Sequence, residues 1–252
     1  MRPWIVITGA SAGIGEATAK EFSRKAYNLI LLARRKDRLE KLKAEILSSG
    51  SPSEVVIAEV DVTKPEQIAA FVKTHSNLLE KVEVLINNAG LAKGTDKMQE
   101  AKTADWDVMI LTNITGLLHF TRAVLPFFVA KQSGHIINIG SVAGRWTYPG
   151  GGVYAATKFA VRAITEGLRL DLIGKQIRVS NIEPGMVNTD FSLVRFEDKE
   201  KAKAVYAGMK PLTAEDIAET ISWVVSRPAH VNIQELVIFP TDQASIRDVN
   251  RS

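Results

Sequence analysis

Short apolar runs rich in β-branched residues alternate along the whole chain with longer segments of helical periodicity. Runs such as Leu29–Leu32 and Val84–Ile86 are apolar without alternation, which is typical of strands covered by helices on both faces. This alternation constrains the fold more than any other feature, because it is the pattern of βαβ units around a parallel sheet. The sequence therefore predicts an α/β fold built on one doubly wound sheet of seven parallel strands.

The expected elements can be placed by their residue ranges. The predicted strands are 4–8, 28–33, 54–60, 83–87, 135–140, 178–182 and 233–239. The predicted helices are 13–26, 36–49, 64–80, 104–131, 153–173 and 213–227, with a less regular helical stretch near 196–209. Thr63 and Thr213 precede two of these helices as capping hydroxyls. Neither a linker-like segment nor a repeat divides the 252 residues, so a single domain over 1–252 is expected.

The composition excludes several classes of protein. With zero cysteines, a disulfide framework or a thiolate metal site is impossible. His75, His119, His135 and His230 are scattered without ligand spacing, so each is interpreted as a surface or capping residue and no metal is expected. The 32 basic and 28 acidic residues are interspersed, which argues against nucleic acid as a partner. A strand starts directly after the first residues and no apolar run approaches the ~20 residues of a bilayer span, so a cytoplasmic protein without a membrane partner is expected.

A glycine-rich turn follows the first predicted strand and opens the first helix, with the sequence Thr8-Gly9-Ala10-Ser11-Ala12-Gly13-Ile14-Gly15. Backbone N–H groups at a helix start can hold a pyrophosphate, and glycines allow its oxygens to approach. The spacing is Gly-xxx-Gly-x-Gly rather than the commoner Gly-x-Gly-xx-Gly, so an ordinary glycine-rich turn is the alternative. The position between strand and helix favours a Rossmann-type cofactor site that includes Gly9, Ser11, Gly13, Ile14 and Gly15.

The end of the second predicted strand indicates which dinucleotide is bound. Where an acidic residue would hydrogen-bond the adenosine ribose, the chain instead reads Ala33-Arg34-Arg35-Lys36-Asp37-Arg38. The guanidinium groups of Arg34 and Arg35 suit a 2′-phosphate. A solvated basic face is the alternative, but cations at a helix N-terminus oppose the helix dipole, an arrangement that favours a bound anion. The sequence therefore predicts NADP as the cofactor.

Tyr154 and Lys158 are four residues apart and would share one face of a helix. Tyr206 and Lys210 repeat this spacing, but glycine and proline interrupt that segment. Only Tyr154 has a serine, Ser141, thirteen residues upstream, directly after an apolar strand whose carboxyl end would face the cofactor crevice. This set suits proton transfer at an alcohol oxygen, since a nearby ammonium favours the phenolate of a phenol whose pKa is otherwise ~10.

These ordered motifs resemble the short-chain dehydrogenase/reductase superfamily. The resemblance is carried by the glycine turn, Asn87-Asn88-Ala89-Gly90, Asn113, Ser141, Tyr154-xxx-Lys158 and Pro184-Gly185. It implies that Tyr154 is the general acid/base, that Lys158 lowers its pKa and holds the nicotinamide ribose, that Ser141 bonds the substrate oxygen, and that Asn113 sustains a water-mediated proton relay to Lys158. It implies further cofactor contacts from Asp61, Val62, Asn88, Ala89, Gly90, Pro184, Gly185, Val187 and Thr189, although Asp61 could equally cap the following helix.

Within the superfamily the chain resembles the NADP-dependent 3-hydroxy acid dehydrogenases. This is carried by Ala33–Arg35, His135–Ser141, Glu183–Gly185, Phe191–Phe196 and Arg227–Asn232. It implies hydride transfer between the nicotinamide and a short 3-hydroxy acid, a hydroxy amino acid such as L-serine or L-allo-threonine, or the corresponding semialdehyde. The substrate would contact Ser141 and Tyr154 beneath a covering segment at about 186–212. Its carboxylate would need a cation, for which Arg195 is preferred and Arg145 competes, and a surface ion pair is the alternative for either.

Two other functions stay open at this point. One is a carbonyl reductase for bulkier ketones or 3-oxoacyl substrates. The other is a non-enzymatic NADP-binding sensor or interaction module, against which the intact set of Asn113, Ser141, Tyr154 and Lys158 argues. The resemblance also implies a homotetramer, consistent with the high apolar content of the predicted helices at 104–131 and 153–173.

Overall fold

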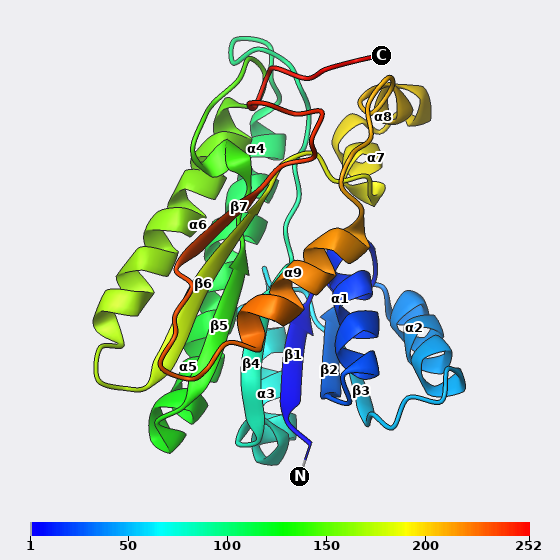
Figure 1. Ribbon diagram of the computed structural model, residues 1–252. Coiled ribbons are helices and arrows are strands. Elements are labelled where there is room, and N and C mark those ends of the chain that lie inside the picture. The colour runs from blue at the N-terminus through cyan, green and yellow to red at the C-terminus, as the bar shows by residue number, and fades with distance from the viewer. Residues whose placement is uncertain (1) are drawn as a thin grey trace.

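A single sheet of seven parallel strands organises the computed structural model, which describes residues 2–252 (Figure 1). The strand order is β3-β2-β1-β4-β5-β6-β7, with helices on both faces. The strands are β1 (Trp4–Thr8), β2 (Asn28–Ala33), β3 (Val55–Glu59), β4 (Val82–Asn87), β5 (Gly134–Ile139), β6 (Ile177–Pro184) and β7 (Glu235–Ile238). The predicted α/β fold with a doubly wound, seven-stranded parallel sheet is confirmed.

The helices follow the predicted ranges closely over most of the chain. They are α1 (Gly13–Arg24), α2 (Lys36–Ser48), α3 (Pro65–Leu79), α4 (Thr103–Ile110), a π-helical turn η1 (Leu111–Gly116), α5 (Leu117–Lys131), a 3₁₀ turn η2 (Val142–Gly144), α6 (Gly152–Asp171), α7 (Asp190–Phe196), α8 (Lys199–Ala204) and α9 (Ala214–Val225). The predicted helical stretch near 196–209 is confirmed only in part: the short helix α8 lies within it, whereas α7, which ends at Phe196, was not predicted.

The two expected helix caps differ in outcome. Thr213 is confirmed as a cap, since its side chain accepts from the backbone of Asp216 and the Asp216 carboxylate accepts from the backbone of Thr213. The cap predicted at Thr63 is wrong. Lys64 occupies the N-cap position of α3, and the backbone and hydroxyl of Thr63 instead donate to one carboxylate oxygen of Asp61, at 2.9 and 2.8 Å. Asp61 therefore fastens the turn that precedes α3.

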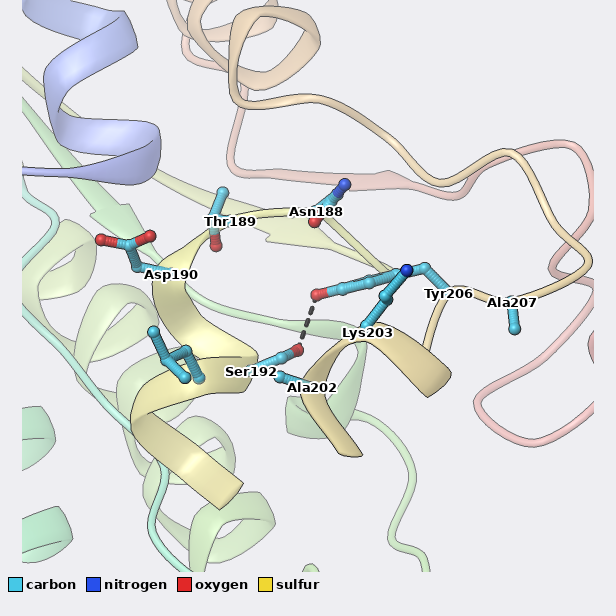
Figure 2. A pocket seen from close by; sticks show the side chains of 9 residues that line it. Asn188, Thr189, Asp190, Ser192, Ala202, Lys203, Tyr206 and Ala207 are labelled. Atoms are coloured by element: carbon cyan, nitrogen blue, oxygen red, sulfur yellow. Dashed lines mark hydrogen bonds between the residues drawn. The ribbon is translucent and has the colours of Figure 1, made fainter. Parts of the chain in front are cut away.

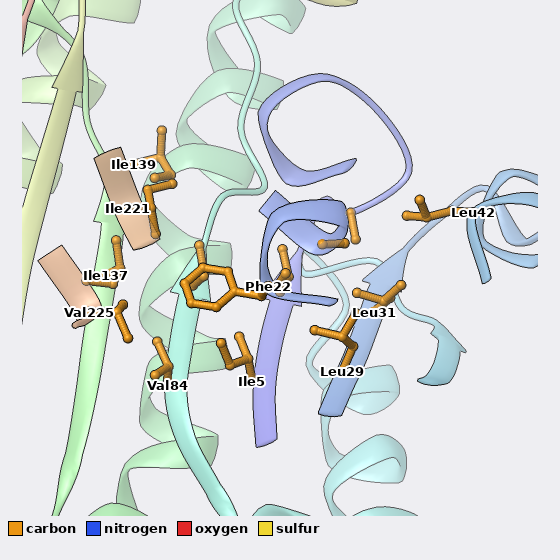
Figure 3. Packing of buried hydrophobic residues seen from close by; sticks show 14 of the residues in the cluster. Ile5, Phe22, Leu29, Leu31, Leu42, Val84, Ile137, Ile139, Ile221 and Val225 are labelled. Atoms are coloured by element: carbon orange, nitrogen blue, oxygen red, sulfur yellow. The ribbon is translucent and has the colours of Figure 1, made fainter. Parts of the chain in front are cut away.

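The core lies in two apolar layers, one on each face of the sheet. On one face, Phe22 of α1 and Ile221 of α9 pack against strand residues such as Ile5, Leu29 and Ile137 (Figure 3). On the other face, aromatic and aliphatic side chains of α3 and α5 cover the opposite set of strand residues; they include Phe71, Phe120, Val124 and Phe128. Because both faces are covered, the central strands carry the continuous apolar runs that the sequence displays.

α4, η1 and α5 form one continuous helical run over Thr103–Lys131. The run is 29 residues long and apolar enough by length and composition to cross a membrane, which the sequence alone did not indicate. Within the fold, Phe120 and Phe128 from this run are fully buried against the sheet, as in a core helix. Its opposite side leaves Leu111 and Leu118 exposed. One face of this helical run therefore packs in the core, and further apolar side chains of the run are exposed to solvent.

All seven strands point their carboxyl ends to the same edge of the sheet, at the top of Figure 1. α7 and α8 lie at this edge, between β6 and α9 in the chain. The two ends of this insertion meet, because the backbone of Asn188 donates to Leu212 at 2.8 Å and the backbone of Leu212 donates to Met186 at 2.9 Å. We call residues 188–212 the lid segment. The edge and the lid segment together enclose the candidate site.

Candidate active site

A cleft of about 510 Å³ runs along the carboxyl edge of the sheet beneath the lid segment. One end is lined by the glycine turn after β1 and by Arg34 and Arg35. The other end is lined by Ser141, Tyr154 and Lys158. Residues that are far apart in the sequence therefore meet in one continuous cavity. This is the place where open α/β sheets bind ligands.

The glycine turn fits closely against the loop after β4. Gly9 has a φ of +66°, and a Cβ there would lie 2.9 Å from the Cα of Ala89. A Cβ on Gly15 would lie 2.5 Å from the side-chain nitrogen of Asn88. That Asn88 amide donates to the carbonyls of Thr8 and Gly9 at 3.0 and 3.1 Å. The glycines thus allow α1 to start next to this loop, and Ala12 at its N-cap position provides no side-chain oxygen to occupy the first N–H groups.

The basic residues after β2 form a group of cations around the start of α2. Arg35 is the N-cap residue of α2, and its guanidinium donates to the Ser11 hydroxyl at 3.1 Å. Burial lowers the pKa of Arg35, and the neighbouring Arg38 and Arg34 lower it further, while Asp190 opposes them. Arg38 forms an ion pair of 3.0 Å with Asp190, the first residue of α7. An anion bound beside Arg34 and Arg35 would relieve the repulsion among these cations.

Tyr154 and Lys158 both lie on the buried side of α6. Burial raises the pKa of Tyr154 well above its usual value, and the nearby Tyr148 raises it further. A hydrogen bond with Ser141 and the charge of Arg195 act in the opposite direction. The Lys158 ammonium donates to the carbonyl of Ile139 at 2.7 Å and lies 5.9 Å from the centre of the Tyr154 ring. The direction therefore differs from the lowered pKa expected from the sequence.

Burial lowers the pKa of Lys158 itself to about 8. Ser141 sits directly after β5, where its hydroxyl accepts from the backbone of Ala143 at 3.1 Å. Asn113 lies in the π-helical turn η1, a distortion often found at functional sites. Its amide exchanges two hydrogen bonds of 2.8 Å with the backbone of Leu91 and donates to Thr157 at 3.0 Å. The four side chains predicted to be catalytic therefore come from three separate segments of the chain: η1, the residue after β5, and α6.

Gly90 links two of these side chains. A Cβ on Gly90 would lie 3.2 Å from the carbonyl oxygen of the Asn113 side chain and 3.7 Å from the Lys158 ammonium nitrogen. Asn113 and Lys158 therefore approach the same backbone position. Most of the remaining residues predicted to contact the cofactor also line the cleft; they are Ser11, Ile14, Asp61, Val62, Asn88, Ala89, Pro184, Gly185, Val187 and Thr189. Gly15 and the predicted catalytic residue Asn113 lie behind this lining rather than in it.

The two arginines considered for a substrate carboxylate lie in different surroundings. Arg195 of α7 lines the cleft, donates to the Tyr148 hydroxyl at 2.7 Å and lies 5.9 Å from the centre of the Tyr154 ring. Arg145 forms ion pairs with Glu183 and Glu235 instead. Arg195 is therefore the arginine that stands beside the tyrosine of the site.

Several lining residues were not predicted from the sequence. Tyr148 and Gln243 line the cleft, and no motif or spacing distinguishes them. Phe191 lines it too, although the sequence assigned it no role beyond the stretch that carries the resemblance. Tyr206, which the sequence excluded as the catalytic tyrosine, also lines the cleft. Its hydroxyl donates to the carbonyl of Val187 and hydrogen-bonds Ser192, both at 2.7 Å. Figure 2 shows this contact across a second cavity, of about 420 Å³, between α7 and α8. Tyr206 thus fastens the lid segment to the end of β6.

The histidines contribute nothing to a metal site within residues 2–252, where no three His, Asp or Glu side chains form a group that could hold a metal ion. The expectation that His135 is a surface or capping residue is wrong. Its ring is buried between β5 and β6 and hydrogen-bonds the Ser180 hydroxyl at 2.8 Å. Burial and the charge of Arg178 lower the pKa of His135 to about 3.

Comparison with known proteins agrees with this geometry. A family model described as short chain dehydrogenase matches residues 3–200. The chain is 44% identical over 242 residues to the NADP-dependent 3-hydroxy acid dehydrogenase YdfG of Salmonella typhi, covering 95% of this chain and 96% of that protein. It is 42% identical over 241 residues to the serine 3-dehydrogenase of Agrobacterium fabrum, covering 95% and 94%. The solved closed form of serine dehydrogenase complexed with NADP⁺ superimposes with a TM-score of 0.92 at 42% identity, covering 99% of this chain and all of that one.

Proposed function

The chain belongs to the short-chain dehydrogenase family, and from this we infer that it is an NADP-dependent oxidoreductase acting on short 3-hydroxy acids. The reaction interconverts a hydroxy acid, or a hydroxy amino acid of the serine type, and the corresponding carbonyl compound. The observation that carries this inference is the single cleft that joins the glycine turn and Arg34 and Arg35 to Ser141, Tyr154 and Lys158. The similarity to 3-hydroxy acid and serine dehydrogenases over nearly the whole chain supports the substrate class.

The residues of the cleft fit NADP. The closely packed glycine turn at the start of α1 suits a pyrophosphate, and the cation group at Arg34 and Arg35 suits a 2′-phosphate. We propose that Asp61 and Val62 border the adenine, and that Asn88, Ala89 and Gly90 line the groove. Pro184, Gly185, Val187 and Thr189 would lie near the nicotinamide end. When bound, NADP supplies the hydride chemistry of the reaction.

Tyr154 is proposed as the group that moves the proton at the substrate oxygen. Because burial raises its pKa, its phenol keeps its proton at neutral pH and is ready to donate it to a carbonyl oxygen. Oxidation of an alcohol needs the opposite transfer, so the proton must first leave Tyr154. Substrate oxidation is therefore expected to gain from rising pH and carbonyl reduction to lose from it.

Ser141, Lys158 and Asn113 are proposed to support this proton transfer. Ser141 lies close enough to Tyr154 to lower the pKa of its phenol, so both hydroxyls can reach the same substrate oxygen. Lys158 holds a positive charge near the Tyr154 ring and is proposed to bind the nicotinamide ribose. Asn113 is proposed to hold a water that relays protons to Lys158, which is supported by the approach of both side chains to Gly90.

Arg195 is proposed to bind the substrate carboxylate. In a 3-hydroxy acid the carboxylate is two carbons from the reacting carbon, so its cation must stand close to Tyr154. The guanidinium of Arg195 meets this requirement, at 5.9 Å from the centre of that ring. We also propose that the lid segment covers the substrate, and that residues 1–252 act as a single dinucleotide-binding and catalytic domain.

A homotetramer is proposed for the assembly, and the cytoplasm for its location. Leu111 and Leu118 on the Thr103–Lys131 run are 46% and 42% exposed, and Ile173 after α6 is 85% exposed. Apolar side chains at such positions suit subunit contacts. A monomeric mass by light scattering at working concentration would reject the tetramer.

A substrate panel with NADP and NAD, followed by nicotinamide absorbance, tests the activity. Short 3-hydroxy acids, L-serine and L-allo-threonine should be oxidised with NADP. Activity only on bulky uncharged ketones would favour the alternative reductase, and no turnover of any kind would favour a sensor.

Arg195→Leu tests the substrate end of the site separately. Losing a charged partner of the carboxylate should lower kcat/KM for hydroxy acids by about 2–5 kcal/mol. Reduction of an uncharged carbonyl compound should suffer much less. Equal losses for both classes would remove Arg195 from carboxylate binding, since a disordered lid segment would depress both activities together.

A further inference from the structure

Four charged side chains meet behind the turn that follows Ser141. The Nε of Arg145 donates to one carboxylate oxygen of Glu183, and its Nη2 donates to Glu235. The Nε of Arg162 donates to the other oxygen of Glu235 at 2.9 Å. The second oxygen of Glu183 accepts from the Asn181 amide at 2.7 Å. We call Arg145, Glu183, Glu235 and Arg162 the charge cluster.

The charge cluster joins the segments that carry the reacting residues. Arg145 is the C-cap residue of η2, the turn that begins directly after Ser141. Glu183 lies in β6 directly before Pro184 at the cleft, and Glu235 begins β7. Arg162 lies on α6, one turn after Lys158. One cluster thus ties the Ser141 turn to the sheet and, through Glu235, to the helix that carries Tyr154.

The orientation of the Ser141 hydroxyl depends on the turn that Arg145 anchors. The backbone of Ala143 donates to that hydroxyl at 3.1 Å, and the backbone of Gly144 donates to the Ser141 carbonyl at 2.8 Å. Gly144 is pressed against α6, since a Cβ there would lie 2.8 Å from the carbonyl oxygen of Lys158. A shift of this turn would therefore move the Ser141 hydroxyl relative to Tyr154 and Lys158.

Electrostatics keep Arg145 at this position. Glu183 is fully buried, and burial raises the pKa of its carboxyl, while Arg145 acts to lower it. Removing the partner of a buried carboxylate leaves an uncompensated charge, which is costly. Arg145 also bridges to Glu235, so its guanidinium is engaged by two carboxylates. It is therefore not available to bind a substrate carboxylate.

We propose that Arg145 is a positioning residue for the reaction, which holds the turn 142–144 through Glu183 and Glu235 and so fixes the Ser141 hydroxyl beside Tyr154. The proposal rests on the function proposed for Ser141 above. It gives Arg145 a role in the rate of the chemical step rather than in binding NADP.

Arg145→Gln tests the proposal in the full-length enzyme. A displacement of about 1 Å at a reacting group can cost about 100-fold in rate, so kcat should fall about 10- to 100-fold. The dissociation constant for NADPH, measured by its fluorescence, should change less than about 2-fold, because the cluster lies outside the cofactor contacts. Arg24→Gln is the matched control, since Arg24 pairs with the largely buried Glu21 on α1. It should lower the melting temperature without changing kcat.

A double-substitution cycle with Ser141→Ala separates positioning from general stability. If Arg145 acts through Ser141, Arg145→Gln should cost less than about 2-fold in the Ser141→Ala enzyme, where no hydroxyl remains to misplace. If Arg145→Gln lowers kcat by about 10- to 100-fold both with and without the Ser141 hydroxyl, the proposal is overturned. A wild-type kcat in Arg145→Gln would also overturn it. If Ser141→Ala itself keeps full activity, the role of Ser141 in the proposed function fails instead.

Glu235→Gln keeps the test decisive if Arg145→Gln does not fold. This substitution leaves the buried pair of Arg145 and Glu183 in place and weakens only the bridge to β7 and α6. Glu235→Gln should lower kcat less than Arg145→Gln does. This loss should be absent when Ser141 is also replaced by alanine, and the affinity for NADPH should not change. A loss that persists without Ser141 would contradict the proposal.

Discussion

Tyr154 is the side chain on which the proposed chemistry depends most. Tyr154→Phe removes the proton carrier while keeping the ring that packs on Phe191. Turnover should therefore fall about 10²- to 10⁴-fold with NADP binding nearly unchanged, as measured by steady-state kinetics and cofactor titration. Wild-type turnover with a rate-limiting chemical step would contradict the assignment.

The control for this substitution must be a tyrosine away from the cleft. Tyr206 repeats the sequence spacing but is unsuitable, because its hydroxyl holds the lid segment through Val187 and Ser192. Tyr27 is the better choice, since its ring packs edge-on against Phe22 in the core. Tyr27→Phe should leave kcat unchanged.

Arg34 and Arg35 are predicted to set the choice between NADP and NAD. Each charged hydrogen bond to a 2′-phosphate contributes about 1.5–3 kcal/mol, so each neutralised arginine should shift the preference towards NAD by about 10- to 100-fold. Titration of Arg34→Gln and Arg35→Gln with both reduced cofactors measures this. Lys41→Gln, at an exposed position on α2, the helix that follows Arg35, is the control. Equal weakening of both cofactors would mean that no 2′-phosphate is bound here.

The sequence predicted the identity of the site residues better than their surroundings. Tyr154 was separated from Tyr206 by the serine thirteen residues upstream, and both the glycine turn and Arg34 and Arg35 line the cleft as expected. The partners of Arg145 could not be predicted, because Glu183 and Glu235 are brought together only by the pairing of β6 with β7. The raised pKa of Tyr154 likewise depends on burial, which spacing does not reveal.

Among the helices, the long ones with apolar periodicity were predicted well, and those of the lid segment were predicted only in part. Two capping residues explain this difference. Thr189 accepts from the backbone of Phe191 and starts α7 earlier than expected, and Asp198 caps α8 in the same way. Glu197 between them has a φ of +53°, which ends α7. Short helices of this kind depend on local caps rather than on periodicity.

The capping box of α9 offers a test of stability at one helix. Thr213→Ala removes the side-chain oxygen that accepts from the backbone of Asp216. The free energy of unfolding should fall by about 1 kcal/mol, with about 2 kcal/mol as the upper range for such caps. Urea denaturation at fixed protein concentration measures the change. Thr220→Ala, within the same helix, is the control and should not lower stability in this way; an equal loss there would argue against capping.

The parallel sheet is a property of the molecule as a whole. Parallel strands need crossover connections, and these place β2 and β3 on one side of β1 and β4 to β7 on the other. The alternation of strands and helices in the sequence was sufficient to predict this architecture. The position of the lid segment over the cleft was expected only from resemblance, because no periodicity in residues 186–212 specifies what it packs against.

His135 couples the stability of the molecule to pH. Its pKa is about 3 when folded, below the usual value of ~6.5 that it regains on unfolding. As the pH falls, the imidazole of His135 is protonated in the unfolded chain before it is protonated in the folded protein. The free energy of unfolding is therefore highest above about pH 6.5 and decreases below it. This one group should contribute a loss of about 2 kcal/mol between about pH 6.5 and about pH 5.

Urea denaturation across this range measures the effect. His135→Asn should reduce the slope of stability against pH, since no imidazole is left to protonate. His230→Asn, at an exposed position, is the matched control. An unchanged slope in His135→Asn would show that other groups cause the acid sensitivity.

The joined ends of the lid segment have a consequence for how such a molecule can diverge. Backbone hydrogen bonds between Asn188, Leu212 and Met186 join the two ends of the lid segment. These bonds do not involve the side chains of the residues between 188 and 212. Doubling the length of a closed loop costs only about 0.6 kcal/mol, so residues within it can be replaced, added or removed with little effect on the sheet. Mutation can therefore alter which substrates are accepted while leaving Ser141, after β5, and Tyr154 and Lys158, on α6, in place. We therefore expect that a foreign segment grafted between Asn188 and Leu212 changes substrate specificity without unfolding the sheet.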